Sequence, residues 1–182
     1  MSKGPILIIS GTNRPGANAM KIATIVESIY HKNGTPAELY SLSQMPQELF
    51  LPTSYATKPA SFLATQQRIV EAAGLHVVSP EYNGSLPGVL KYFIDMLKFP
   101  ESFDGKPVTF VGEAAGIWGA LRPVEQLQAI FGYRNAMIYP TRVFIPQINT
   151  KLDPAGQLND AAIVERLESQ VKGFTEFVAR FA

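Results

Sequence analysis

The stretch that decides the fold is ILIISGTNRPGANAMKIATIVESIYHKNG, residues 6–34. It opens with a continuous apolar run, Ile6 to Ser10, which is typical of a short strand buried on both faces. A glycine-containing turn follows, and apolar residues then recur at the spacing of an amphipathic helix until Asn33-Gly34 ends it. A buried strand, a turn and an amphipathic helix together form the first part of a β-α-β unit.

The same alternation continues along the chain. We expect further buried strands at 37–40, 75–79, 108–111 and 136–139, and further helices over 89–97, 121–131 and 163–178. Strands and helices that alternate in this way pack as a parallel sheet with helices on both faces. The sequence therefore predicts an α/β fold, a flavodoxin-like doubly wound sheet of five parallel strands in the order 2-1-3-4-5. The proline-rich stretch 44–59 is interpreted as an excursion within this fold.

Composition limits the possible functions. A chain of 182 residues is long enough for one domain with a sizeable core, and we treat residues 1–182 as a single domain. Its 16 basic and 15 acidic residues nearly balance, so neither nucleic acid nor a membrane surface is expected as a partner. The chain has no cysteine, which excludes thiolate chemistry and thiolate-bound metal, and we expect no metal site. No apolar run approaches the roughly 20 residues that cross a bilayer, and we expect a cytoplasmic protein.

Ligands of open parallel sheets bind beyond the carboxyl ends of the strands. The loops expected there are 11–18, 80–88 and 113–119, which are rich in glycine. In the first loop, backbone N–H groups at a helix N-terminus form an anion site, to which Thr12 adds a hydroxyl and Arg14 a guanidinium. This loop has neither the lysine of a P-loop nor the spacing of the dinucleotide fingerprint. An ordinary turn with an exposed arginine is the alternative.

The second loop reads PEYNGSLPGVLK, residues 80–91. Tyr82 supplies a flat apolar surface on a stiff turn, and Asn83 is suited to hydrogen-bond the edge of a heteroaromatic ring. Together with Gly11-Thr12-Asn13-Arg14 and the segment from Gly116 to Arg122, this loop resembles the motifs of the NADPH-dependent FMN reductase family. The resemblance spans roughly residues 5–145, and the three segments occur in the order and spacing that the fold requires.

That resemblance implies an oxidoreductase that transfers a hydride from NADPH or NADH to bound FMN, and electrons from there to a quinone, flavin, azo compound or similar small-molecule acceptor. It also implies a homodimer or homotetramer. Because the flavin carries the chemistry, we expect no catalytic side chain. The resemblance places Thr12, Arg14, Ala17, Asn18 and Ala19 at the FMN phosphate, Pro80, Glu81, Tyr82, Asn83 and Gly84 along the ring and ribityl chain, and Ala114, Ala115 and Gly116 at the pyrimidine edge.

Four positions stand out against the family pattern. Ala17 and Ala114 replace common hydroxyl side chains, and two lost hydrogen bonds of ~0.5–1.5 kcal/mol each would weaken FMN binding by roughly ten- to a hundredfold. Ala120 replaces a glycine, which is harmless if its backbone is helical. Glu113 is expected near the flavin edge, where a carboxylate would lower the flavin potential. A Glu113 side chain turned to solvent would have no such effect, and we favour this second interpretation.

Two other functions stay open. A flavodoxin-type electron carrier has the same fold, although such carriers are usually strongly acidic and this chain is near neutral. A flavin-free scaffold is favoured only by Ala17 and Ala114. Trp118 is interpreted either as a cap on the flavin or an interface, or as a core residue. The aromatic stretch 92–99 has more apolar surface than one sheet-facing stripe needs, so part of it is expected to face a partner subunit.

Overall fold

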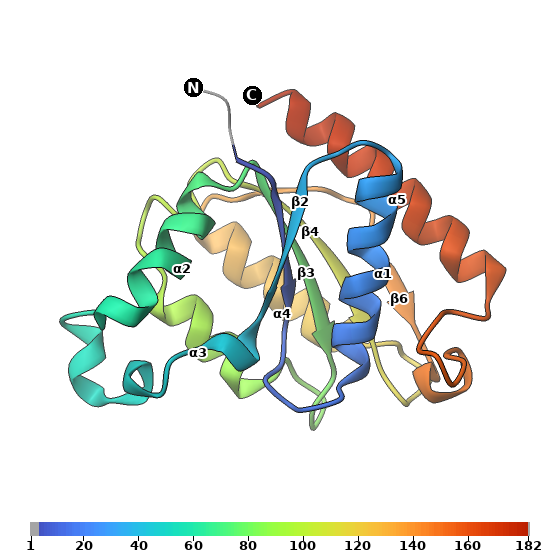
Figure 1. Cartoon of the computed structure of the whole chain (residues 1–182), viewed down its shortest axis with the longest axis horizontal. Coiled ribbons are helices and arrows are strands. Elements are labelled where there is room, and N and C mark those ends of the chain that lie inside the picture. Colours follow the sequence, from blue (N-terminus) through green and yellow to red (C-terminus); the bar gives the residue numbers. More distant parts are fainter. Residues whose placement is uncertain (1–3, 182) are drawn as a thin grey trace.

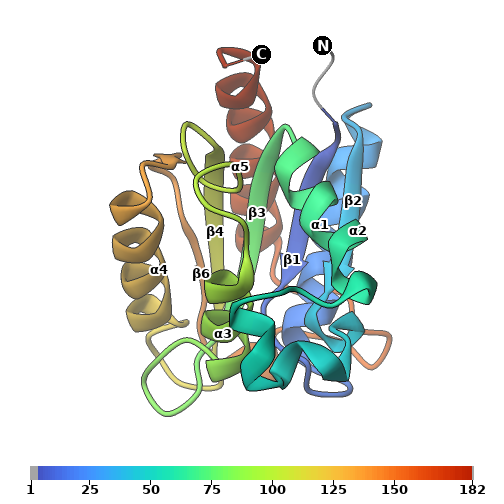
Figure 2. The same cartoon turned by 90° about the vertical axis from the view of Figure 1, so that its left-hand side faces the viewer.

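The computed structural model describes residues 4–181. Its strands form one parallel sheet with the order β2-β1-β3-β4-β5, and a sixth strand, β6, also pairs with β4 (Figure 2). The predicted fold class and strand order are confirmed. The strands are β1 (Ile6–Ser10), β2 (Ala37–Ser41), β3 (Gly74–Pro80), β4 (Pro107–Glu113), β5 (Met137–Ile138) and β6 (Val143–Ile145).

The outer strand beside β4 differs from the prediction of a single strand over 136–139. It is divided into β5 and β6, so within residues 4–181 the sheet has six strands and not five. Pro140 lies between the two pieces, and proline has no N–H group to donate to a neighbouring strand. Gln170, which is fully buried, bridges the interruption. Its Nε2 donates to the carbonyl oxygens of Phe110 (2.9 Å) and Thr141 (3.0 Å).

Helices cover both faces of the sheet. The helices α1 (Asn18–Lys32) and α5 (Ala161–Ala179) lie on one face, and α2 (Ala60–Glu71), α3 (Gly88–Met96) and α4 (Leu121–Tyr133) lie on the other (Figure 1). Each face therefore has its own apolar core. The sequence pattern does not reveal α2, because this helix buries only Phe62 and Ile69 and so lacks a full apolar stripe.

The proline-rich excursion folds into three short 3₁₀ helices that pack against α3. These are η1 (Leu42–Gln44), η2 (Gln47–Phe50) and η3 (Pro52–Tyr55). The Tyr92 hydroxyl donates to the Leu49 carbonyl oxygen at 2.6 Å, and the Tyr92 ring stacks on Phe50. Within the stretch 92–99, most apolar side chains pack inside the chain, and Phe99 is the one that is mainly exposed (53%).

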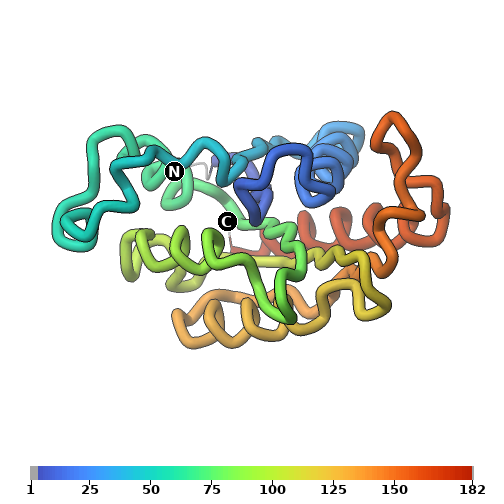
Figure 3. The backbone as a smooth tube through the Cα atoms, turned by 90° about the horizontal axis from the view of Figure 1, so that it is seen from below, coloured from blue at the N-terminus to red at the C-terminus, as the bar shows by residue number. Residues whose placement is uncertain are grey.

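The loops that follow β1, β3 and β4 all lie at one edge of the sheet. Seen from below, they surround the carboxyl ends of the strands, and the segment after β6 joins them from the side (Figure 3). The fold thus brings together four segments that are far apart in the sequence.

Candidate functional site

The first of these loops leads into α1 without a side-chain cap. Ala17 is the N-cap residue and its methyl group accepts no hydrogen bond, and the first turn of α1 holds no acidic side chain. The first N–H groups of a helix have no partner inside the helix, so they attract an anion or an acceptor from elsewhere in the fold. Arg14 lies on the same rim, and its guanidinium has no hydrogen-bond or ion-pair partner among residues 4–181.

Thr12 connects two loops and does not line the cleft. Its side chain is buried, its Oγ1 accepts a hydrogen bond from the Arg14 backbone N–H (3.2 Å), and its hydroxyl lies 3.1 Å from the Tyr82 hydroxyl. Thr12 thus links the Arg14 backbone to the Tyr82 hydroxyl, and its predicted place at a phosphate stays a prediction.

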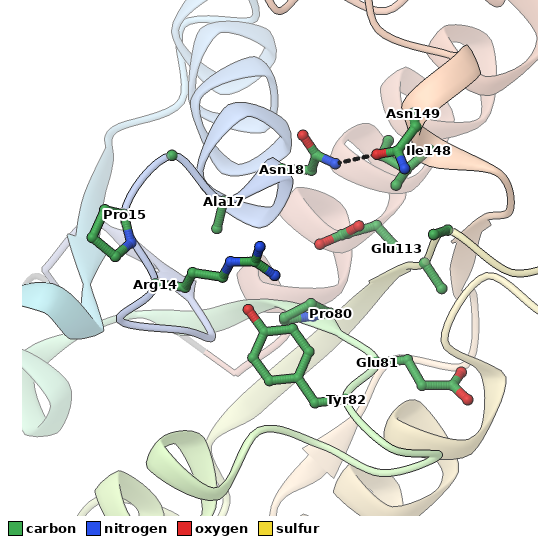
Figure 4. Close-up of a pocket in the computed structure, with 13 residues that line it drawn as sticks. Arg14, Pro15, Ala17, Asn18, Pro80, Glu81, Tyr82, Glu113, Ile148 and Asn149 are labelled. Carbon is green, nitrogen blue, oxygen red and sulfur yellow. Dashed lines mark hydrogen bonds between the residues drawn. The ribbon is translucent and has the colours of Figure 1, made fainter.

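The second loop is a tight turn braced by α4. Tyr82 and Ser85 exchange backbone hydrogen bonds of 2.9 and 3.0 Å, and the two residues between them, Asn83 and Gly84, have φ values of 52° and 75°. Such left-handed pairs are the reason for an Asn-Gly sequence in a turn of this type. From α4, the Gln126 Oε1 accepts from the Ser85 hydroxyl at 2.7 Å. The Tyr82 ring is thereby held at the rim of the cleft (Figure 4).

Two adjoining clefts lie between these loops, with volumes of about 340 Å³ and about 220 Å³. Both are lined by Glu81, Ala114 and Ala115, so they form neighbouring compartments of one depression. The larger compartment extends to Arg14 and the start of α1, and the smaller one extends to Gly116 and Trp118. A volume of this order is within the usual range for small-molecule sites.

Eleven of the thirteen residues predicted for the FMN site line these two clefts. The first cleft includes Arg14, Ala17, Asn18, Pro80, Glu81, Tyr82, Ala114 and Ala115, and the second adds Asn83, Gly84 and Gly116. Thr12 and Ala19 lie behind the surface. That these residues contact FMN stays a prediction.

Glu113 contradicts the interpretation that its side chain turns to solvent. It is the last residue of β4, it is only 5% exposed, and its carboxylate points into the larger cleft (Figure 4). Burial raises the pKa of Glu113 to about 7, while a hydrogen bond from the Ala19 backbone N–H lowers it. A buried, titratable carboxyl group therefore lies in the cleft next to the first turn of α1.

Two further lining residues, Ile148 and Asn149, come from the segment after β6. They belong to a short 3₁₀ helix, η4 (Ile148–Thr150), and Asn149 Oδ1 accepts from Asn18 Nδ2 at 3.0 Å (Figure 4). A signal for them exists in the sequence. A segment that follows an outer parallel strand emerges at the same edge as the other three loops. To use this signal, one first has to recognise residues 143–145 as a strand from the sequence.

The loop after β4 departs from two sequence-based interpretations. Trp118 is 56% exposed and lines the smaller cleft, so it is not a core residue. Ala120 has a φ of 66° and a ψ of 33°, so the helical backbone that would make this alanine harmless is absent. A left-handed conformation costs a non-glycine residue about 1–2 kcal/mol. Burial of the Ala120 methyl group offsets part of that cost.

Two absences complete the description of residues 4–181. In that part of the chain, no three His, Cys, Asp or Glu side chains gather where they could hold a metal ion. None of its helices combines the length and the apolar character that crossing a membrane requires.

Comparison with known proteins shows what this chain is similar to. A family model described as NADPH-dependent FMN reductase matches residues 5–150. A quinone reductase of Escherichia coli strain K12 is 35% identical over 126 residues, which cover 67% of this chain and 67% of that protein. An NAD(P)H-dependent FMN reductase of Pseudomonas aeruginosa is 30% identical over 182 residues and covers 96% of this chain and 95% of that protein.

Solved structures share the fold. The flavoenzyme NAD(P)H:(acceptor) oxidoreductase FerB from Paracoccus denitrificans has a TM-score of 0.78 at 20% identity, with 98% of each chain covered. An archaeal flavodoxin has a TM-score of 0.65 at 12% identity and covers 97% of this chain and 99% of that one. The arrangement of strands and helices is therefore flavodoxin-like.

Proposed function

Because this chain belongs to the NADPH-dependent FMN reductase family, whose cofactors are FMN and NAD(P)H, we propose that it passes electrons from NAD(P)H through FMN to a quinone. The observation that carries the proposal is the pair of adjoining clefts at the carboxyl edge of the sheet. We expect the flavin phosphate and ribityl chain to lie in the larger compartment and the flavin ring to extend into the smaller one, whose open side would receive a small planar partner. A quinone suits that open side because Trp118 gives it an exposed aromatic wall.

The residues present fit a flavin. Glu81 Oε2 is buried and has no hydrogen-bond partner among the described residues, while Glu81 Oε1 accepts from Arg122 at 3.3 Å. A buried acceptor without a donor is unfavourable, and a ligand with N–H or O–H groups satisfies it. The flavin offers such groups on its ring and on its ribityl chain. At the other end of the cleft, Arg14 and the first N–H groups of α1 suit a phosphate.

When bound, FMN supplies the chemistry by accepting a hydride from NAD(P)H and passing electrons to the acceptor. The protein's contribution is to hold and orient the reacting rings. Tyr82, fixed by Thr12 and by the turn that α4 braces, provides a rigid flat surface. Trp118 borders the open side of the smaller compartment, which would admit one planar partner at a time against the flavin ring. The proposal includes a cytoplasmic location, where NAD(P)H is supplied.

A visible spectrum tests this function. The protein is saturated with FMN, purified from excess flavin and mixed anaerobically with NADPH or NADH. Bleaching of the flavin absorbance, followed by its return on addition of a benzoquinone, is the result expected for a reductase. Flavin that stays oxidised after both donors contradicts the proposal and points to an electron carrier. A protein that takes up no flavin at millimolar FMN points to a scaffold. Azo compounds and free flavins in the same assay measure acceptor preference.

Arg14→Ala is expected to raise the FMN dissociation constant by about ten- to a hundredfold. A charge-assisted hydrogen bond contributes about 1.5–3 kcal/mol, and each 1.4 kcal/mol is a factor of ten. Flavin fluorescence quenching measures the constant. The matched control is Arg180→Ala, an exposed arginine at the C-terminal end of α5 that lines neither cleft. Equal FMN affinity in Arg14→Ala and the wild type would show that Arg14 does not hold the phosphate.

We also propose that the protein forms a homodimer or homotetramer. Exposed apolar side chains gather on the excursion and the start of α2, namely Phe50, Leu51, Tyr55 and Leu63. Apolar groups of this size on neighbouring segments are typical of an interface. Light scattering at micromolar concentration is expected to give a mass of two or four chains, and a mass of one chain contradicts the proposal.

A further inference from the structure

The position of Glu113 follows from the alternation of side chains along β4. Residues two apart on a strand point to the same face of the sheet. Val111 belongs to the core on the α1 and α5 side, whereas Phe110 belongs to the opposite core. Glu113 therefore points to the α1 side, where the next structure beyond the end of the strand is the first turn of α1. The carboxylate is brought there by the sheet and not by a mobile loop.

At the start of α1, the Glu113 carboxylate supplies the hydrogen-bond acceptor that the N-cap residue does not provide. The N-cap residue Ala17 has no polar side chain, and the Ala19 backbone N–H hydrogen-bonds the Glu113 carboxylate. A negative charge at a helix N-terminus is favourable because it interacts with the positive end of the helix dipole. An anionic ligand bound at this helix N-terminus would accept hydrogen bonds from the same backbone N–H groups.

The groups that suit a flavin phosphate converge on this carboxylate. Arg14 and Glu113 point toward each other across the cleft in Figure 4, and the start of α1 lies beside them. A phosphate placed between Arg14 and the first turn of α1 would lie next to Glu113. Two anions this close repel each other strongly in a partly buried site, so one of them has to lose its charge or move.

We propose that Glu113 determines how much the flavin phosphate adds to binding, because its carboxylate takes the place of the phosphate at α1 and has to be protonated or displaced before FMN binds. This inference rests on the proposed function, since it assumes that the cleft binds a flavin. It makes Glu113 a residue that sets the selectivity between FMN and riboflavin, which has the same ring and no phosphate. Protonation is accessible near neutral pH, because burial raises the pKa of Glu113 to about 7.

The contribution of Glu113 to the pH dependence of FMN binding can be separated from that of the other charged groups around the cleft. From the first loop, Arg14 lines the site, and on α1 Lys21 donates to the side chain of Asn18, which also lines it. From the β3 loop, Glu81 is paired with Arg122. Lys151, after η4, is paired with Asp160. All of these groups, together with the Tyr82 hydroxyl, are unchanged in a Glu113→Gln variant, so their contributions cancel when the variant is compared with the wild type.

The sign and size of the effect follow from linkage. If FMN binds only to the form with a neutral Glu113 carboxyl, the apparent dissociation constant rises as that group ionises. For a pKa of about 7, the rise between pH 6 and pH 8 is about tenfold. The phosphate itself has a second pKa of about 6 and becomes a dianion over the same range, which favours binding to Arg14 at higher pH. The two effects have opposite signs, so a dissociation constant that rises with pH does not come from the phosphate.

The experiment titrates apoprotein with FMN and with riboflavin between pH 6 and pH 8, using quenching of flavin fluorescence. For the wild type, we expect the FMN dissociation constant to rise by up to about tenfold relative to that of riboflavin. For Glu113→Gln, which keeps the shape and removes the charge, we expect this relative rise to be absent and FMN to bind about tenfold more tightly than in the wild type at pH 8. Glu176→Gln, an exposed glutamate of α5, is the matched control and should behave as the wild type.

Each result has a definite meaning. Identical FMN profiles in the wild type and Glu113→Gln overturn the inference, while the proposed function survives if both proteins bind flavin. Failure of both proteins to bind FMN and riboflavin at every pH overturns the proposed function and this inference with it. Tight FMN binding by Glu113→Gln alone supports the inference.

A check without flavin uses the apoprotein. The unfolded chain ionises Glu113 near the ordinary value of 4.5 and the folded chain only near 7, so this residue reduces stability as pH rises from 5 to 7.5. The thermal midpoint of the wild type is therefore expected to fall relative to that of Glu113→Gln over this range. Parallel midpoints would show that the carboxyl group is not held in the cleft, and would overturn the inference without any variant having to bind a ligand.

Discussion

Gln170→Glu is expected to lower the free energy of unfolding by about 4 kcal/mol, because it places an uncompensated charge in the core. Gln170 is fully buried, and its Nε2 donates to the carbonyl oxygens of Phe110 and Thr141 and to the Thr109 hydroxyl (3.1 Å). A carboxylate has no hydrogen to donate and would face two carbonyl oxygens. Protonation relieves the charge, but only at a cost that grows with pH. Urea unfolding followed by circular dichroism measures the change.

Two controls separate charge from packing. Gln170→Met keeps the length of the side chain and leaves the acceptors unsatisfied, and its expected loss is about 1–3 kcal/mol. Gln44→Glu adds the same charge on an exposed residue of η1 and is expected to change stability by no more than about 0.5 kcal/mol. If Gln170→Glu stays within about 1 kcal/mol of the wild type at pH 7, the bridge between β4 and the divided outer strand is not important for stability.

Gly119→Ala is expected to cost about 3 kcal/mol, the second largest effect. The residue has a φ of +56°, which disfavours any side chain by about 1–2 kcal/mol. An added Cβ would also lie 2.9 Å from the backbone nitrogens of Ile145 and Pro146, which cannot yield as a flexible side chain does. Crowding of this kind typically adds about 1–3 kcal/mol. Chemical denaturation measures the loss.

Gly105→Ala separates the two contributions to the Gly119→Ala effect. Gly105 also has a positive φ, +63°, but an added Cβ there would meet nothing within 4 Å. Its expected loss is therefore about 1 kcal/mol, from the backbone conformation alone. Equal losses for both variants would show that contact with the end of β6 is unimportant. Because Gly119 follows Trp118 directly, we also expect Gly119→Ala to alter the smaller cleft and weaken binding of the acceptor.

The parts of the fold that the sequence predicts are those with a strong local signal. β1, β3 and β4 are short runs buried along their whole length, and such runs are recognisable without any knowledge of their neighbours. The division of the outer strand cannot be recognised in this way. Its second piece, β6, pairs over only three residues, Val143–Ile145, and Pro140 interrupts the apolar pattern. The side chain that bridges the interruption, Gln170, lies in a helix about thirty residues further along the chain.

The prediction of the site from the sequence is limited in the same way, to features with a local signal. Loop motifs predict which segments reach the carboxyl edge, since the order of strands and loops fixes that edge. They do not predict the environment of a single side chain. Glu113 ends a buried strand, so its direction follows from strand alternation, but its surroundings come from the start of α1 and from the segment after β6, which line the same cleft. Nor do they predict the hydrogen bond by which Thr12 links two loops, since it depends on the position of the Tyr82 hydroxyl, 70 residues further along the chain.

The divided outer strand also bears on how the protein behaves at high concentration. The open edge of a sheet is a template on which strands of other molecules add, and this is one route to aggregation. On one side of this sheet the edge consists of a two-residue and a three-residue strand separated by four residues that include Pro140. On the other side, β2 carries Glu38, which is paired with Arg68 at 2.8 Å. Neither edge presents a long, flat, uncharged ladder, so copies of this chain are expected to associate through helices and loops and not by extending the sheet.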